Sequence, residues 1–208
     1  KNAGLPILAS TILLDGSAYI GNLPHLQDIT TKLELLNSMG SSINFHEDGF
    51  IEINSSNILL PEARYELVKT MRASILVMGP LVARYGKAKI SQPGGCDIGT
   101  RPIDFHLSGL EKMGAEITSD SRYIYLKAKK LNPIDFSFPK VSVTGTENLM
   151  MAATLIDGTT TLKNCAKEPE VLELANYLNS CGAKISGAGE SEIEIKGVKK
   201  LEASRWDV

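Results

Sequence analysis

An internal repeat of about seventy residues, present three times, constrains the fold of this chain most strongly. The second part of each copy runs from a helix through a glycine into an alternating run, a polar turn and a second alternating run. A glycine in this place is typical of the left-handed residue that follows a helix, and the alternation is typical of half-buried strands. The three corresponding stretches are residues 36–53, 110–126 and 178–195.

The first part of each copy consists of an apolar helix and a short strand, and the helix is expected over residues 5–14, 73–83 and 149–156. This helix is apolar nearly all round, which predicts that other elements wrap it, whereas the second helix of each copy carries a polar stripe. Helices and strands mixed in this way predict an α/β fold, and three copies predict a pseudo-threefold arrangement. We expect one domain over residues 1–208, with repeats at about 1–66, 67–139 and 140–200.

The middle copy contains a longer loop than the other two. The two marker glycines are 24 residues apart in the first and third copies and 28 residues apart in the second. The additional residues fall between 91 and 104, a stretch that holds Cys96 among glycines and Arg101 after it. Because two copies do without the extension, the fold does not require it, and a loop of this kind is typical of a functional segment.

Cys96 has two interpretations. A free cysteine is most often a buried and inert thiol. The flanking glycines, Asp97 and Arg101 instead favour an exposed and partly ionised thiol, and we favour this second interpretation. Cys181 stands where the other copies have methionine, which predicts a core position, and Cys165 has no distinguishing neighbours. Three cysteines without disulfide or metal-ligand spacing favour reduced thiols in a cytosol.

Polar residues occupy the same place in each copy, fourteen residues before the first glycine, where the apolar helix begins. These residues are Asn2, Arg72 and Thr144. A helix start can bind an anion, and Lys1, Arg72 and Arg101 would add full positive charges. The alternative is ordinary capping by Asn2 and Thr144 with solvated cations. We expect capping for Asn2 and Thr144 taken alone, and anion binding for the three cations taken together.

The composition excludes several classes of partner. A net charge of -2 supplies no general field for nucleic acid, and no apolar run reaches the roughly 18 residues of a membrane span. No zinc-protease, nucleophile-elbow or dinucleotide motif occurs. His25 and His46 fit surface or core roles. The role of His106 is left open, because this residue follows the long loop. The chain begins without Met, so we expect it to be a piece of a longer protein.

Several segments together resemble the UDP-N-acetylglucosamine enolpyruvyl transferases. They are residues 1–6, 68–74, 79–84, 93–104, 144–153 and 168–170, with a proline-glycine-glycine-cysteine loop as the most specific part. The resemblance implies an inverted α/β barrel with internal helices and outward sheets. It also implies transfer of the enolpyruvyl group of phosphoenolpyruvate to the 3-hydroxyl of UDP-N-acetylglucosamine with release of phosphate. That reaction opens peptidoglycan synthesis, for cell wall biogenesis and cell division, in the cytoplasm.

The resemblance also implies a role for individual residues. Cys96 would protonate the enolpyruvyl methylene and could add covalently to phosphoenolpyruvate or to fosfomycin. No cofactor and no metal are implied. Phosphoenolpyruvate would be held by Lys1, Asn2, Arg72 and Arg101. UDP-N-acetylglucosamine would contact Asn2, Arg101, Pro102, Ile103, Asp104, Phe105, Lys140, Ser142, Val143 and Thr144.

Members of that family have two such domains with the active site between them. This chain resembles one domain and lacks the second-domain aspartate and a further arginine, so we expect weak ligand binding and no turnover by the chain alone. An alternative is a non-catalytic nucleotide-sugar binding module whose loop is structural. The sister family that acts on shikimate phosphate shares the fold but lacks the cysteine loop, and therefore fits less well.

Overall fold

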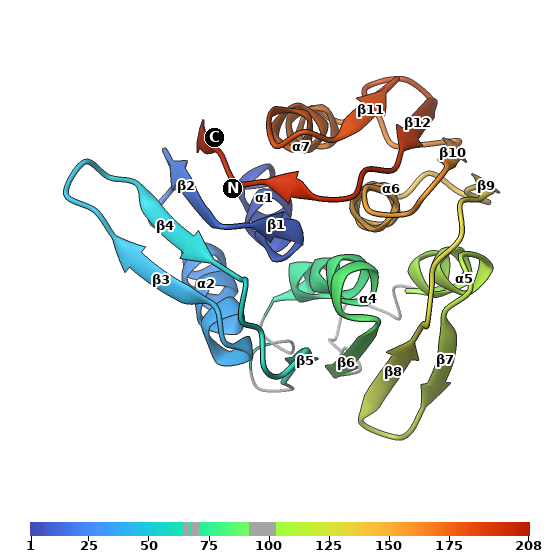
Figure 1. Ribbon diagram of the computed structural model, residues 1–208, viewed down its shortest axis with the longest axis horizontal. Coiled ribbons are helices and arrows are strands. Elements are labelled where there is room, and N and C mark those ends of the chain that lie inside the picture. Colours follow the sequence, from blue (N-terminus) through green and yellow to red (C-terminus); the bar gives the residue numbers. More distant parts are fainter. Residues whose placement is uncertain (65–66, 68–70, 92–102) are drawn as a thin grey trace.

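The computed structural model describes residues 1–64, 67, 71–91 and 103–208. Within these residues, three four-stranded sheets surround a central group of helices, as Figure 1 shows. Helices inside and sheets outside are the predicted pseudo-threefold inverted α/β barrel, so the predicted fold class is confirmed. No helix in the described ranges is both long and apolar enough to cross a membrane.

The three units contain equivalent elements in the same order. The first unit contains α1 (Gly4–Ser10), η1 (Thr11–Leu13), β1 (Leu14–Asp15), β2 (Ser17–Gly21), α2 (Gln27–Met39), β3 (Ser42–Phe45), β4 (Ile51–Asn54) and β5 (Glu62–Ala63). The second contains η2 (Arg72–Val77), α4 (Met78–Tyr85), β6 (Lys87–Ser91), α5 (Asp104–Lys112), β7 (Glu116–Ser119), β8 (Tyr123–Lys127) and β9 (Asp135–Ser137). The third contains α6 (Val143–Ala153), β10 (Thr159–Lys163), α7 (Pro169–Ser180), β11 (Lys184–Ser186), β12 (Glu192–Lys196), β13 (Leu201–Glu202) and β14 (Arg205–Asp207).

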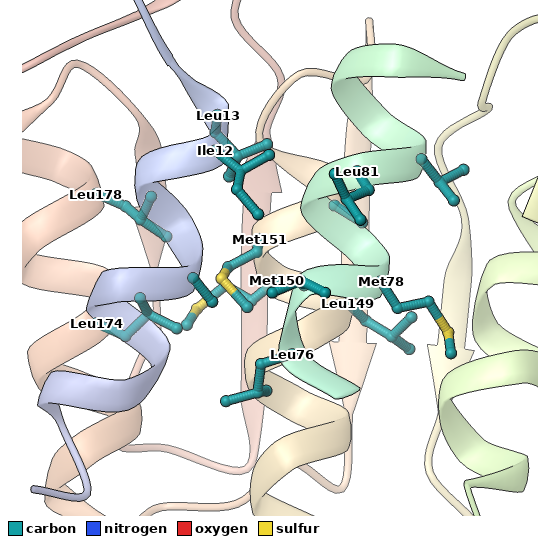
Figure 2. Packing of buried hydrophobic residues seen from close by; sticks show 14 of the residues in the cluster. Ile12, Leu13, Leu76, Met78, Leu81, Leu149, Met150, Met151, Leu174 and Leu178 are labelled. Atoms are coloured by element: carbon teal, nitrogen blue, oxygen red, sulfur yellow. The ribbon is translucent and has the colours of Figure 1, made fainter. Parts of the chain in front are cut away.

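The inner helices α1, α4 and α6 form the centre of the core. All seven residues of α1 are buried, as are Gly145–Ala153 of α6, so these helices have no face for water. Apolar side chains of α4 and α6 and of η1, which continues α1, meet between these segments, as Figure 2 shows. Each such side chain contributes about 1.5–3 kcal/mol by leaving water. The prediction that apolar helices lie inside is confirmed.

One inner helix differs from the prediction. A continuous helix was expected over residues 73–83, but η2 is a 3-10 segment and the α-helix begins only at Met78. Pro80 explains the break, because proline lacks an N–H and clashes with the carbonyl four residues earlier inside an α-helix. With the restart at Met78, Pro80 falls in the first turn, where proline is tolerated.

The inner helices run in the same direction. α1 contacts η2, and η1 contacts α4, so the beginning of one segment packs on the beginning of the next and the end on the end. In Figure 2 the labelled residues of these helices follow one another in the same sense, from Leu76 through Met78 to Leu81 and from Leu149 to Met151. The starts of α1, η2 and α6 therefore lie at one end of the barrel.

The three sheets share one register. In the first sheet Ile53 faces Ala18 on one side and Ile43 on the other. The same relation holds for Leu126 with Ala88 and Ile117 in the second sheet. In the third sheet Ile195 of β12 faces Thr160 of β10 on one side and Ile185 of β11 on the other. Alternate residues of β4, β8 and β12 are buried, as the alternation in the sequence predicted.

The fourth strand of each sheet comes from the neighbouring unit, which the sequence did not reveal. β5 pairs in parallel with β6, β9 with β10, and β14 with β2. The last strand of the chain therefore completes the sheet of the first unit, and β13 pairs with β1 beside it. Figure 1 shows the end of the chain lying against the first unit.

The outer helices α2, α5 and α7 contact both an inner helix and a sheet. Each ends before a glycine with positive φ, as predicted: Gly40 at +115°, Gly114 at +105° and Gly182 at +97°. This backbone conformation costs little for glycine alone, and it turns the chain directly from the helix into the hairpin. The equivalent core positions Met39, Met113 and Cys181 are all buried, so the prediction for Cys181 is confirmed.

Candidate functional site

The predicted site residues gather where the inner helices begin. Lys1 and Asn2 directly precede α1, Arg72 is the first residue of η2, and Val143 and Thr144 open α6. Because these helices run in the same direction, their positive dipole ends share one face of the barrel. The structure describes the backbone of Arg72 but not its side chain. Cys96, Arg101 and Pro102 lie outside the described residues.

Lys1 is already paired in this structure. Its Nζ lies 2.5 Å from Oδ2 of Asp28, in the first turn of α2, and its side chain is half exposed. Lys1, Asn2 and Ala3 line one side of an open pocket of about 530 Å³. Pro169, Glu170 and Glu173 at the start of α7 line the other side. An anion that binds Lys1 here has to compete with Asp28 and with the two glutamates.

The two predicted nucleotide-sugar segments lie side by side. Ile103 and Phe105 are half buried and Asp104 is exposed at the start of α5. Lys140 is exposed before α6, and Ser142, Val143 and Thr144 are half buried at its start. A hydrogen bond of 3.3 Å between Oγ1 of Thr144 and Nε2 of His106 joins the two segments. The structure thus brings residues 103–106 and 140–144 together.

The capping prediction for Asn2 and Thr144 is wrong. The residue before α1 is Ala3, and no side chain caps that helix. At α6 the cap is Ser142, whose Oγ accepts a hydrogen bond from the backbone N–H of Gly145 at 3.1 Å. Thr144 is two residues inside the helix, so its hydroxyl is too far along the chain to cap, and it contacts His106 instead.

His106 is the centre of a buried polar chain that connects three elements. Only 3% of the residue is exposed, and Nδ1 lies 2.8 Å from Nδ2 of Asn148 in α6. Oδ1 of Asn148 accepts a hydrogen bond from the backbone N–H of Gly79 in α4, also at 2.8 Å. Burial lowers the pKa of His106 from its usual 6.5 to about 4, so the ring is neutral at neutral pH.

A second buried polar group lies beneath the start of the inner helices. Lys32 of α2 is fully buried, and its Nζ donates to the carbonyl oxygen of Ala73 at 2.6 Å. Glu147 of α6 is 2% exposed. Burial lowers the pKa of Lys32 to about 7, against the opposing attraction of Glu147. Burial, then the nearby charges of Glu170 and Glu168, raise the pKa of Glu147 to about 8, although Lys32 acts in the opposite direction.

A further cavity lies away from this face. It has a volume of about 880 Å³ and is lined by residues of α2, β3 and β4 together with the segment before α2, including Leu33, Phe45 and His46. Among the described residues, no predicted site residue lines this cavity. His46 pairs there with Glu52 at 3.3 Å, which fits the surface role expected for that histidine.

The two described cysteines are both buried. Cys165 and Cys181 are each 2% exposed, and burial raises the pKa of the Cys165 thiol to about 11. Neither is a reactive thiol. In the described part of the chain, no group of three or more His, Cys, Asp or Glu side chains is arranged to hold a metal ion.

The sequence did not reveal the roles of His106, Asn148, Lys32 and Glu147. His106 is separated from Asn148 by 42 residues along the chain, so local spacing carries no signal of the pair. A glutamate and an asparagine inside an otherwise apolar helix were the available hint, since buried polar side chains need partners.

The whole chain matches known proteins. The family model described as EPSP synthase (3-phosphoshikimate 1-carboxyvinyltransferase) matches residues 1–208. A UDP-N-acetylglucosamine 1-carboxyvinyltransferase of Hydrogenovibrio crunogenus is 54% identical over 201 residues, which cover 97% of this chain and 48% of that protein. The protein of the same name from Saccharophagus degradans is 54% identical over 209 residues, covering 100% of this chain and 50% of that protein. The chain therefore spans about half the length of these curated relatives.

Solved structures support the fold. The enolpyruvyl transferase NikO from Streptomyces tendae superposes with a TM-score of 0.84 at 19% identity, over 100% of this chain and 49% of that chain. An EPSP synthase from Acinetobacter baumannii superposes with a TM-score of 0.76 at 18% identity, over 100% and 47%. Because the family model covers the full sequence and the barrel is the same, the chain belongs to the EPSP synthase (3-phosphoshikimate 1-carboxyvinyltransferase) family.

Proposed function

We propose that this chain is the cysteine-bearing part of a UDP-N-acetylglucosamine 1-carboxyvinyltransferase. In the reaction, the 3-hydroxyl oxygen of the sugar bonds to C2 of phosphoenolpyruvate, the bond from C2 to the phosphate oxygen breaks, and phosphate leaves with the hydroxyl proton. The observation that carries this proposal is the 54% identity with two relatives of that name over 97% and 100% of the chain. Synthesis of peptidoglycan in the cytoplasm is the corresponding cellular role.

The nucleotide sugar would bind where α5 and α6 begin. Two of the segments assigned to it, residues 103–105 and 140–144, lie beside each other there. Lys140 and the first backbone N–H groups of α6 are suited to the negative charge of a diphosphate. Asn2 would contact the same ligand from the start of α1, and Arg101 and Pro102 from the loop.

Phosphoenolpyruvate would bind between the cations of this face. Lys1, Arg72 and Arg101 would neutralise its phosphate and carboxylate, with Asn2 as a hydrogen-bonding partner. Lys1 would exchange Asp28, 2.5 Å away, for the substrate. Cys96 would be the general acid for the methylene carbon, because nearby positive charge lowers the pKa of a thiol.

Modification by fosfomycin tests this proposal. Attack by a thiolate opens the epoxide: a carbon–sulfur bond forms, a carbon–oxygen bond breaks, and the oxygen takes a proton, so the mass rises by one whole fosfomycin. We expect one adduct per chain, mapped to Cys96 by peptide mass spectrometry and absent in Cys96→Ala. Cys165 and Cys181 are internal controls, because each is only 2% exposed. An adduct on either of them, or none on Cys96, would contradict the proposal.

A non-catalytic nucleotide-sugar binding module, whose loop is structural, is the alternative function. Calorimetric titration with UDP-N-acetylglucosamine separates the two functions. Binding of the nucleotide sugar by a chain whose Cys96 stays unmodified by fosfomycin would favour the module.

A further inference from the structure

The hydrogen bonds around His106 define which atoms carry protons. The backbone N–H of Gly79 can only donate, so the atom of Asn148 that it meets at 2.8 Å must be the oxygen Oδ1. The other end of the same amide is therefore Nδ2, a donor, and it faces Nδ1 of His106 at 2.8 Å. An N–H cannot donate to another N–H, so Nδ1 is the acceptor nitrogen of the ring.

The proton of the neutral imidazole is therefore on Nε2. Nε2 lies 3.3 Å from Oγ1 of Thr144 and donates to it. Burial keeps the ring neutral, since the pKa of His106 is lowered to about 4. The threonine oxygen accepts this hydrogen bond, so its own hydroxyl proton has to point away from His106.

Three buried threonines of this protein donate to a carbonyl of the preceding turn. Thr146 donates to the carbonyl oxygen of Ser142 at 2.8 Å, and Thr11 and Thr154 do the same with Leu8 and Met151 at 2.7 Å each. Thr144 sits in the first turn of α6, where no earlier helical carbonyl is available. Among the described residues, His106 is its only hydrogen-bonding partner.

We propose that Asn148 and His106 are positioning residues that fix Thr144 as a hydrogen-bond donor toward an oxygen of the bound nucleotide sugar. This inference rests on the proposed function, because it assigns an atom within that binding site. Thr144 contacts the ligand, whereas His106 and Asn148 act through it. The Gly79 N–H determines the direction of its hydrogen bond to Asn148, and the directions of the hydrogen bonds to His106 and Thr144 follow from it.

The close approach of α4 and α6 is part of this arrangement. A Cβ atom at position 79 would lie 2.6 Å from Oδ1 and 2.5 Å from the backbone oxygen of Asn148. Any side chain there would push the two helices apart and break the hydrogen bond that sets the amide. Glycine at this position therefore matters for the proton on His106, although the two residues do not touch.

Nitrogen-15 NMR of histidine-labelled protein tests the positioning directly. The chain has three histidines, and His25→Gln and His46→Gln variants identify their signals. We expect His106 to carry its proton on Nε2 and to stay neutral from pH 6 to pH 8. In Asn148→Asp, the carboxylate still accepts from Gly79 but cannot donate, so the His106 signal should move to the Nδ1–H or the doubly protonated form. A proton on Nδ1 in the wild type would overturn the inference.

Binding of UDP-N-acetylglucosamine tests the donor role of Thr144. Thr144→Val keeps the shape of the side chain but removes the hydroxyl, and we expect the dissociation constant to rise roughly 10-fold. Thr144→Ser should restore binding to within about 2-fold, since it restores the donor. Equal affinities of the wild type and Thr144→Val would overturn the ligand part of the inference. A wild type that binds no nucleotide sugar would overturn the proposed function, while the tautomer measurement would still decide the positioning part.

Discussion

Single residues decide the polar chemistry inside this barrel. Lys32 and Glu147 are buried among the starts of the inner helices, where ionised side chains lose their hydration. The pKa values move toward the neutral forms, down to about 7 for Lys32 and up to about 8 for Glu147. Near neutral pH Glu147 is therefore mostly protonated and Lys32 partly deprotonated, and the neutral forms are less costly to bury.

This burial predicts a pH dependence of stability. Between pH 4.5 and pH 8, folded Glu147 keeps a proton that the unfolded chain has lost, so its contribution to stability declines as pH rises. We expect the difference in unfolding free energy between wild type and Glu147→Gln to fall across this range by on the order of a few kcal/mol. Urea denaturation at pH 5 and pH 8 measures it.

The matched control for this experiment is Glu34→Gln, because Glu34 is exposed on α2. The difference in unfolding free energy between the wild type and Glu34→Gln should be the same at pH 5 and pH 8. Lys32→Met gives the complementary test: folded Lys32 holds fewer protons than the unfolded chain between pH 7 and pH 10.5, so the wild type should regain stability there and this variant should not. If the difference in unfolding free energy between the wild type and Glu147→Gln were the same at both pH values, Glu147 would not be protonated in the folded state.

At this scale the sequence predicted positions better than partners. The equivalence of Cys181 with Met39 and Met113 correctly placed it in the core, because equivalent positions of a repeat have similar surroundings. His106 stayed open because its partners come from a different unit, 38 and 42 residues away. Contacts between units depend on how the units pack, and no local pattern encodes them. Cys96, Arg101 and Pro102 lie outside the described residues, so their proposed roles are argued from the sequence.

The helices and strands themselves were largely predictable. Helix ends follow from Gly40, Gly114 and Gly182, and strand faces follow from alternation. The interruption before α4 was missed although Pro80 signals it. The cap of α6 was also misplaced, because Ser142 and Thr144 are both suitable residue types and only the backbone decides between them.

The cap gives a prediction at the level of one helix. Ser142→Ala removes the oxygen that accepts the Gly145 N–H, and we expect a loss of about 1 kcal/mol of stability. Ser142→Asp, which keeps an acceptor, should lose less. Ser38→Ala is the control: Ser38 donates to Leu35 inside α2 and caps nothing, so the change should stay within about 0.5 kcal/mol. Equal losses at the two serines in urea titrations would argue against capping by Ser142.

Across the whole molecule, three units share inner helices, sheets and register, and each lends one strand to the next. The pseudo-threefold arrangement was readable from the repeat. The lent strands were not, because β5, β9 and β14 are two or three residues long and pair with a different unit. Such short segments carry too little alternation to be recognised.

The last lent strand is anchored by Trp206, which packs its ring against Tyr177 at 5.7 Å and donates from Nε1 to Glu173 at 3.0 Å. We expect Trp206→Ala to cost roughly 2 kcal/mol, below the range for a fully buried ring because Trp206 is only half buried. Thermal unfolding measures the loss. Arg205→Ala, at the neighbouring exposed ion pair with Asp48, should cost less than about 1 kcal/mol. A larger effect at Arg205 would contradict the anchoring role.

The pairing of β14 with β2 has a consequence for how the protein is made. A ribosome produces residues 17–21 almost two hundred residues before residues 205–207, so during synthesis the first sheet has an open edge with unpaired N–H and C=O groups. The first unit cannot complete its sheet on its own, and that sheet closes only when residues 205–207 have emerged. Any nascent chain that stops before β14 exposes that edge to its neighbours, which makes prematurely ended translation products of this protein prone to aggregate.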